Sequence, residues 1–270
     1  MLRKYQSEIK HLKYYIISII IVTLSSYSVY LFCSDKQIIS FNEEDQFFEA
    51  GTAVLFFLSA LLFLYTNKNN RNIFLLSLSI LMFIGAGEEI SWGQAFFDFH
   101  TPAELKKVNV QGEFNIHNIE IFNSNNFNHT HKTGWKRITE INFLFRAFIM
   151  IYGILIPLLA RHSKSVYSIT KRYQIPIIPV SIGFFFLMIW LVLQGLFKYL
   201  PSGKPETYYS SAGEIFEFLT SYIFFTTSIY FTKQMQHSVS GIPATKYPTT
   251  KFQQQLKSDH GIKLSDQIVR

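Results

Sequence analysis

The sequence predicts an all-α fold, specifically a polytopic membrane helix bundle of about six transmembrane helices, with a long outer loop between the third and the fourth. Three observations lead to this prediction. Hydrophobic residues make up 49% of the 270 residues, and charged residues only 16%, against about 25% in soluble domains. The charged residues gather between long apolar runs. Several of these runs approach the roughly 20 residues that a helix needs to cross a bilayer.

Six apolar segments meet this length requirement. In chain order they are residues 14–32, 47–65, 73–97, 141–159, 175–200 and 212–231. The first is long for a cleaved signal peptide and no small-residue cleavage site follows it, so we expect it to remain as an anchor. The third passes through Glu88 and Glu89, and it either continues to Phe97 or ends at Gly87 with an interfacial helix after it. The two prolines of the fifth fall in its first turn, where a helix tolerates them.

The basic residues predict the orientation of these segments. Lysines and arginines flank alternate ends of the segments, at the N-terminus, in 66–72, in 160–174 and directly after 231. By the positive-inside rule these parts are cytoplasmic. We therefore expect a six-helix transmembrane domain over residues 1–232, with an outer loop at 98–140, both termini in the cytoplasm and a flexible cytoplasmic tail over 233–270. The net charge of +7 is spread over such flanks, which indicates a lipid bilayer and not nucleic acid as the partner.

Charged side chains fall near the outer ends of four of the predicted helices. They are Glu49, Glu88, Glu89, Arg146, Glu214 and Glu217. Ionisable groups at membrane depth are costly and mark functional sites. Glu214 and Glu217 are three residues apart and share a helix face, whereas Glu88 and Glu89 point about 100° apart, so only one of them can face the others directly. If the helices form a bundle, these groups can meet at one depth.

The outer loop carries a second set of polar residues. Between residues 109 and 118 they alternate, as Asn109, Gln111, Glu113, Asn115 and His117. Alternation puts side chains on one face of an extended segment, so we expect a polar strip that lies over the mouth of the bundle. His117 is the candidate for a titrating or metal-binding group, because imidazole changes charge near neutral pH.

These two sets define the candidate site. The candidate catalytic residues are Glu49, Glu88, Glu89, His117, Glu214 and Glu217. The candidate substrate-binding residues are Trp92, Gln94, Asn115, Asn118 and Arg146. Carboxylates favour Mg²⁺, Mn²⁺ or Ca²⁺, and the addition of a histidine would admit Zn²⁺ or Fe²⁺. No metal-binding motif lies among these residues, so a divalent metal as cofactor stays an open question.

Three blocks of sequence carry a family resemblance. They are Gly-Ala-Gly-Glu-Glu-Ile-Ser-Trp-Gly-Gln at 85–94, Thr-Pro-Ala-Glu-Leu at 101–105 and Asn-Val-Gln-Gly-Glu-Phe-Asn-Ile-His-Asn at 109–118. Together they resemble an uncharacterised family of bacterial multi-pass membrane proteins, in which a Gly-Glu-Glu-Ile-Ser-Trp-Gly-Gln block precedes a Thr-Pro-Glu-like element and an Asn-x-Gln-x-Glu-x-Asn-x-His-Asn block. The resemblance implies the bacterial inner membrane and a shared site, but it supplies no activity.

Three functions are compatible with these features. The first is a membrane-embedded enzyme that acts on a lipid or lipid-linked substrate, with carboxylates as general acid and base. The second is a proton- or cation-coupled transporter, which is disfavoured because the charges are confined to the outer half. The third is a non-catalytic assembly partner, in which carboxylates pair with Arg146 to make helix packing specific. The sequence favours the enzyme and leaves the substrate, the reaction and the oligomeric state open.

Overall fold

The computed structural model describes residues 2–41, 47–128, 130–199 and 206–239. In these ranges the chain is helical, without a β-strand and with two isolated β-bridges. The predicted all-α class is therefore confirmed. The long helices are α1 (Leu2–Tyr27), α4 (Phe47–Asn70), α5 (Ile73–Glu89), α11 (Val180–Tyr199), α12 (Glu206–Val239) and the continuous rod formed by α8 (Ile141–Phe148), the π-helix η3 (Ile149–Leu155) and α9 (Ile156–His162).

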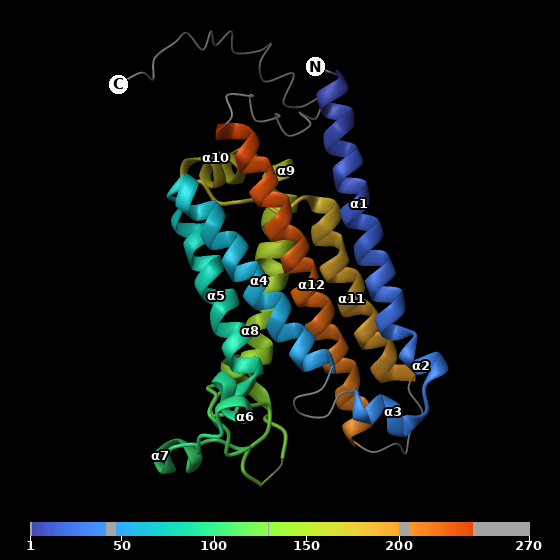
Figure 1. Ribbon diagram of the computed structural model, residues 1–270, viewed down its shortest axis with the longest axis vertical. Coiled ribbons are helices and arrows are strands. Elements are labelled where there is room, and N and C mark those ends of the chain that lie inside the picture. The colour runs from blue at the N-terminus through green and yellow to red at the C-terminus, as the bar shows by residue number, and fades with distance from the viewer. Residues whose placement is uncertain (1, 42–46, 129, 200–205, 240–270) are drawn as a thin grey trace.

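Short helices connect the long ones. They are α2 (Val29–Phe32), α3 (Asp35–Ser40), η1 (Ser91–Gly93), α6 (Gln94–Phe97), α7 (Ala103–Lys106), η2 (Gly134–Thr139) and α10 (Lys164–Arg172). Figure 1 shows the long helices side by side as one elongated bundle, with the loop that holds α6 and α7 at one end. We call this the loop end. The start of α1, the last turns of α12 and α10 all lie at the opposite end.

Membrane association follows from the length and composition of three of these helices. In the described residues, Leu12–Phe32, Phe47–Asn70 and Ile141–His162 are long and apolar enough to cross a membrane, and Val180–Leu196 is a shorter apolar helix. Their outward sides carry large apolar side chains that the rest of the chain leaves uncovered, such as Leu24 on α1 and Val54 on α4. An apolar exterior of this kind suits contact with lipid.

Helix α12 is the centre of the packing. It contacts α1, α3, α4 and α11 along its length. Phe224 of α12 is fully buried and packs its ring against Phe148 and Phe186, at centroid distances of 5.9 and 5.1 Å. Toward the end opposite the loop, the hydroxyl groups of Thr66 and Thr232 join α4 to α12 at 2.7 Å. These contacts fix α12 relative to α4, and so fix the acidic residues that both helices carry.

Two predicted segment boundaries are wrong. The third segment does not continue to Phe97: α5 ends at Glu89, and Ser91 and Trp92 then adopt positive φ angles of 44° and 56°. The alternative end at Gly87 is two residues too early. The fifth segment does not start at residue 175, because α11 begins at Val180. The residue before a proline avoids the helical conformation, and here two prolines at 176 and 179 keep the whole approach to α11 out of a helix.

The predicted tail begins inside a helix. Helix α12 continues through residues 233–239 to Val239, well past the predicted end of the sixth segment. The rest of the predicted flexible tail, 240–270, lies outside the described residues.

Candidate functional site

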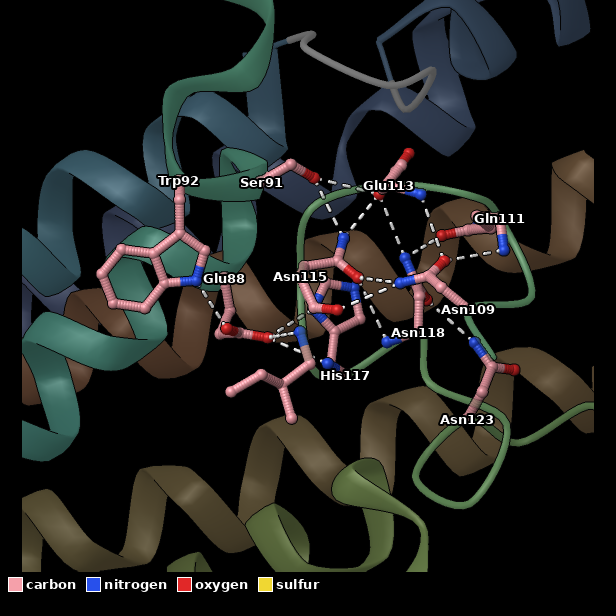
Figure 2. A network of polar contacts seen from close by, with 11 residues as sticks. Glu88, Ser91, Trp92, Asn109, Gln111, Glu113, Asn115, His117, Asn118 and Asn123 are labelled. Atoms are coloured by element: carbon pink, nitrogen blue, oxygen red, sulfur yellow. Dashed lines mark hydrogen bonds and ion pairs between the residues drawn. The ribbon is translucent and has the colours of Figure 1, made fainter. Parts of the chain in front are cut away.

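Glu88, in the last turn of α5, binds the outer loop to the end of that helix (Figure 2). Its Oε1 accepts a hydrogen bond from Nε1 of Trp92 at 2.7 Å. Its Oε2 accepts the backbone N–H groups of Ile116 and His117, at 2.6 and 2.9 Å. Nδ1 of His117 lies 3.5 Å from the same oxygen. Both carboxylate oxygens of Glu88 are therefore engaged by the protein itself.

The contact between Trp92 and Glu88 depends on a turn and not on a continuous helix. The positive φ angles at Ser91 and Trp92 fold the chain back over the last turn of α5. The indole then lies against Gly87, where an added Cβ would come within 2.9 Å of the ring. Helical spacing predicts that residues 88 and 92 meet, and they do, but only glycine at position 87 lets the ring lie this close.

Glu113 is the centre of a second set of hydrogen bonds (Figure 2). Its Oε2 accepts from Oγ of Ser91 at 3.0 Å, from Nδ2 of Asn115 at 2.5 Å and from Nδ2 of Asn118 at 3.1 Å. Nδ2 of Asn109 donates to Oδ1 of Asn115 at 3.0 Å. The three asparagines are buried. We call the set formed by Glu88, Ser91, Trp92, Asn109, Glu113, Asn115 and Asn118 the loop network.

The predicted extended polar strip is wrong. The segment folds back on itself: the N–H of Val110 donates to the carbonyl of Asn118 at 2.7 Å, and the N–H of Glu120 to the carbonyl of Val108 at 2.8 Å. Gly112, with a φ of +75°, allows the reversal. Asparagine side chains form hydrogen bonds with nearby backbone groups in turns, and here they replace the regular partners of a strand. The loop lies against the end of α5, where Glu88 accepts its backbone N–H groups.

Three predicted substrate-binding residues use their amide groups inside this loop. Gln94 donates to Oγ1 of Thr101 at 3.0 Å and accepts the N–H of Phe114 at 2.8 Å. Asn118 accepts from Nδ2 of Asn123 at 2.8 Å. Asn115 is held by Glu113, as described above. The structure therefore places Gln94, Asn115 and Asn118 where they stabilise the loop.

Two residues of this region were missed by sequence reasoning as site members. Glu113 appeared only as one position in an alternating pattern, and Asn123 lies in a stretch so rich in asparagine that no single one stands out. A local signal exists for Glu113, because a carboxylate four residues after Asn109 and two before Asn115 can serve as a shared acceptor in a turn.

A separate group of carboxylates comes together from three helices. Glu89 of α5 interacts electrostatically with Glu49 of α4 and with Glu214 and Glu217 of α12, as well as with its neighbour Glu88. Glu214 interacts in turn with Glu217 and Glu49. Glu89 and its three distant partners are all half-buried. We call Glu49, Glu89, Glu214 and Glu217 the acid cluster.

Two basic groups lie beside the acid cluster. Glu217 interacts electrostatically with His117 and with Arg146 of α8. The guanidinium of Arg146 lies 6.0 Å from the centre of the Phe216 ring, which is next to Glu217 on α12. His117 therefore contacts the loop network through Glu88 and faces the acid cluster through Glu217. The seven charged candidates, Glu49, Glu88, Glu89, His117, Arg146, Glu214 and Glu217, thus lie in one place.

The acid cluster differs from the loop network in its hydrogen bonding. Within the described part of the chain, no hydrogen bond or ion pair engages the carboxylates of Glu89, Glu214 or Glu217. Like charges at short range repel each other strongly at low dielectric. Arg146 places one permanent positive charge beside Glu217, and bound protons or a cationic ligand would relieve the repulsion among Glu89, Glu214 and Glu217 further.

The described residues give no support to a metal centre. No three His, Cys, Asp or Glu side chains among them are placed to hold one metal ion. What the acid cluster offers chemically is a set of neighbouring carboxyl groups that can exchange protons, with an imidazole beside them.

Comparisons with known proteins do not add to this picture. No family model, no curated protein and no solved structure matches the chain. The resemblance of residues 85–118 to a bacterial membrane protein family therefore stays a prediction, and the function has to be inferred from the site itself.

Proposed function

We propose that the protein is a multi-pass protein of the bacterial inner membrane and that its acid cluster is the outward-facing site of a membrane-embedded enzyme acting on a lipid or lipid-linked substrate. In this proposal six rods cross the membrane: α1 with α2, α4, α5, α8 through α9, α11 and α12. Both termini are cytoplasmic. The start of α1 and the last turns of α12 lie at the same end of the bundle (Figure 1). This placement supports an even number of membrane crossings.

The main support for this proposal is that three carboxylates receive no hydrogen bond from the described part of the protein. Glu89, Glu214 and Glu217 are half-buried and close to each other, and no described protein group bonds to them. Interacting titratable groups in such a place are typical of functional sites.

The arrangement suits proton transfer. Carboxyl groups that lie close together share protons, because they do not all ionise at once, and one can then act as an acid while another acts as a base. We assign these roles to Glu89 and Glu217, which come from different helices. His117, which lies beside Glu217 and is partly exposed, carries protons to and from the site. Arg146 neutralises part of the charge and holds an anionic group of the substrate, such as a phosphate.

The surroundings of the site suit a substrate that arrives from the lipid. Helix α6 lies at the loop end and presents the exposed aromatic rings of Phe96 and Phe97. Trp135 of η2 is also exposed. Aromatic residues are enriched where a membrane protein meets the lipid–water interface. A lipid headgroup at this level would lie at the depth of the acid cluster.

The experiment is an incubation of the purified protein with a total lipid extract, followed by mass spectrometry of the lipids. We expect the wild-type chain to change at least one lipid species, and Glu89→Gln and Glu217→Gln to abolish the change. Glu104→Gln is the matched control, because Glu104 is exposed and pairs only with Lys107 at the surface. Identical lipid profiles for wild type and Glu89→Gln would contradict the enzyme.

The transporter alternative predicts a different result from the same variants. A cluster of carboxyl groups that exchange protons is also what a proton-coupled transporter requires. If the wild-type chain in liposomes moves protons and Glu89→Gln does not, while the lipid profile never changes, the site belongs to a transporter.

A further inference from the structure

Buried hydroxyl groups without a hydrogen-bond partner lie along one face of the first two helices. They belong to Tyr15, Thr23 and Tyr27 of α1 and to Tyr30 of α2. Residues at this spacing share a helical face. In the described ranges only two other buried side-chain oxygens lack a partner, and they lie elsewhere, on Asn125 and Thr220.

This face points into the bundle. The ring of Tyr30 meets that of Tyr208 of α12 edge-on at a centroid distance of 5.7 Å. Thr23 is only 5% exposed, whereas its neighbours Ile21 and Leu24 are 60% and 69% exposed on the outward side. The helix therefore has hydroxyl groups on its inner side and apolar side chains on its outer side, the reverse of a surface helix in a soluble protein.

Other buried hydroxyls in the same bundle are satisfied. The side chain of Thr52 on α4 donates to the carbonyl of Phe48, and that of Thr227 on α12 donates to the carbonyl of Ile223, both at 2.8 Å. The hydroxyl of Tyr152 donates to the carbonyl of Pro176 at 2.9 Å. Leaving a buried hydroxyl unpaired destabilises a protein, so three such groups within two turns of α1 and α2 require a common explanation.

The position of these groups limits what their partner can be. The phenol group of Tyr30 lies within electrostatic range of those of Tyr27 and Tyr208. This place is near the loop end, where α1 passes into α2 (Figure 1). Ile19, one turn before Thr23, is fully buried. The polar region therefore extends from the loop end to Thr23 and is bounded by the apolar side chain of Ile19, which separates it from the hydroxyl of Tyr15 one turn further on.

We propose that Thr23, Tyr27 and Tyr30 hold a short chain of bound water molecules between α1, α2 and α12, open toward the loop end and closed at Ile19. Water fits because hydroxyl groups both donate and accept hydrogen bonds, and because buried waters typically bridge polar groups that would otherwise be unsatisfied. The three neutral hydroxyls give no charge that would select an ion. This proposal does not depend on the function of the acid cluster.

Cysteine labelling of the full-length chain in lipid nanodiscs tests the proposal. Cys33 is the sole cysteine, so Cys33→Ser gives a cysteine-free background for Thr23→Cys, Tyr27→Cys and Tyr30→Cys. A charged methanethiosulfonate reagent reacts with thiolates, which form in water and not in an apolar environment. We expect these three positions to react at least about tenfold faster than Ile19→Cys and the lipid-facing Leu24→Cys. Equal, slow rates at all five positions would overturn the proposal.

Melting temperatures give an independent readout that needs no cysteine. If water satisfies these hydroxyls, Thr23→Val and Tyr27→Phe remove a hydrogen bond and lower the melting temperature, as Tyr152→Phe must because its hydroxyl has a protein partner. If the region is dry, the same two changes remove an unsatisfied group and raise the melting temperature. A rise for both variants, with a fall for Tyr152→Phe, would exclude bound water.

Discussion

Glu88 and Glu89 are adjacent at the end of α5, and the protein treats their carboxylates in opposite ways. Glu88 accepts three hydrogen bonds, two of them from the backbone of the outer loop. Glu89 points to α4 and α12, where it meets Glu49, Glu214 and Glu217, and no described group bonds to it. One residue therefore belongs to the loop network and the next to the acid cluster.

A carboxylate at the end of a long apolar helix is therefore not by itself a sign of chemistry. A carboxylate that is fully hydrogen-bonded by its own protein stabilises the fold and has little capacity left for a ligand. Glu89, Glu214 and Glu217 accept no hydrogen bond from the described part of the chain, and interacting titratable groups of this kind are typical of functional sites. The loop network thus holds the loop in place, whereas the acid cluster is where we propose that the function lies.

The largest effect should come from removing the centre of the loop network. Glu88→Ala leaves the N–H groups of Ile116, His117 and Trp92 without their acceptor. Hydrogen bonds to charged groups contribute about 1.5–3 kcal/mol each to stability. We therefore expect the free energy of unfolding to fall by at least about 3 kcal/mol, as measured by thermal unfolding in detergent. Hydrogen exchange at the amides of Ile116 and His117 should accelerate. Glu104→Ala, at an exposed ion pair, should change stability by less than about 0.5 kcal/mol.

One glycine beside the loop network and one beside the acid cluster give a second comparison, for which we expect effects on stability of intermediate size. At Gly87 a Cβ would come within 2.9 Å of the Trp92 ring, whereas at Gly213 on α12, next to Glu214, nothing lies within 4 Å. Gly87→Ala should destabilise the protein by about 1–3 kcal/mol through overpacking. Gly213→Ala should stabilise it by up to about 1 kcal/mol, because alanine favours a helix. A stable Gly87→Ala variant with an unchanged tryptophan emission spectrum would show that the turn at Trp92 is not tightly packed.

The smallest effect should come from the basic neighbour of the acid cluster. Arg146→Met removes the positive charge that faces Glu217 but keeps much of the side chain against Phe216. We expect the free energy of unfolding to fall by about 1 kcal/mol, and Glu217→Gln in addition to restore most of this loss. A double-mutant cycle of the two changes measures the interaction between these neighbours. If the two changes simply add, Arg146 does not balance the charge of Glu217.

Much of the fold could be predicted from the sequence, because long apolar runs bounded by basic residues have few alternatives to helices. The boundaries were less predictable. The end of α5 depends on positive φ angles at Ser91 and Trp92, which are unusual for residues other than glycine. The start of α11 at Val180 is consistent with Pro176 and Pro179, because the residue before a proline avoids the helical conformation.

The site was predictable in part. That Glu49, Glu89, Glu214 and Glu217 lie at a similar depth follows from counting along helices, and the 100° between Glu88 and Glu89 separates their directions. The sequence does not predict which of the two faces the acid cluster, because this depends on the loop that Glu88 binds. Alternation in 109–118 suggested an extended strip, but asparagine side chains bond locally and favour turns, which hid the role of Glu113.

The most direct test of this account is the melting temperature of Glu88→Gln and Glu89→Gln, measured side by side in the same detergent. Glutamine keeps the size of the side chain and removes the charge. We predict that Glu88→Gln melts several degrees lower than the wild type, because an amide N–H₂ then faces backbone donors. Glu89→Gln should melt at the same temperature or higher, because repulsion in the acid cluster falls. A Glu89→Gln variant that is destabilised as much as Glu88→Gln would contradict it, since Glu89 would then be a structural residue as well.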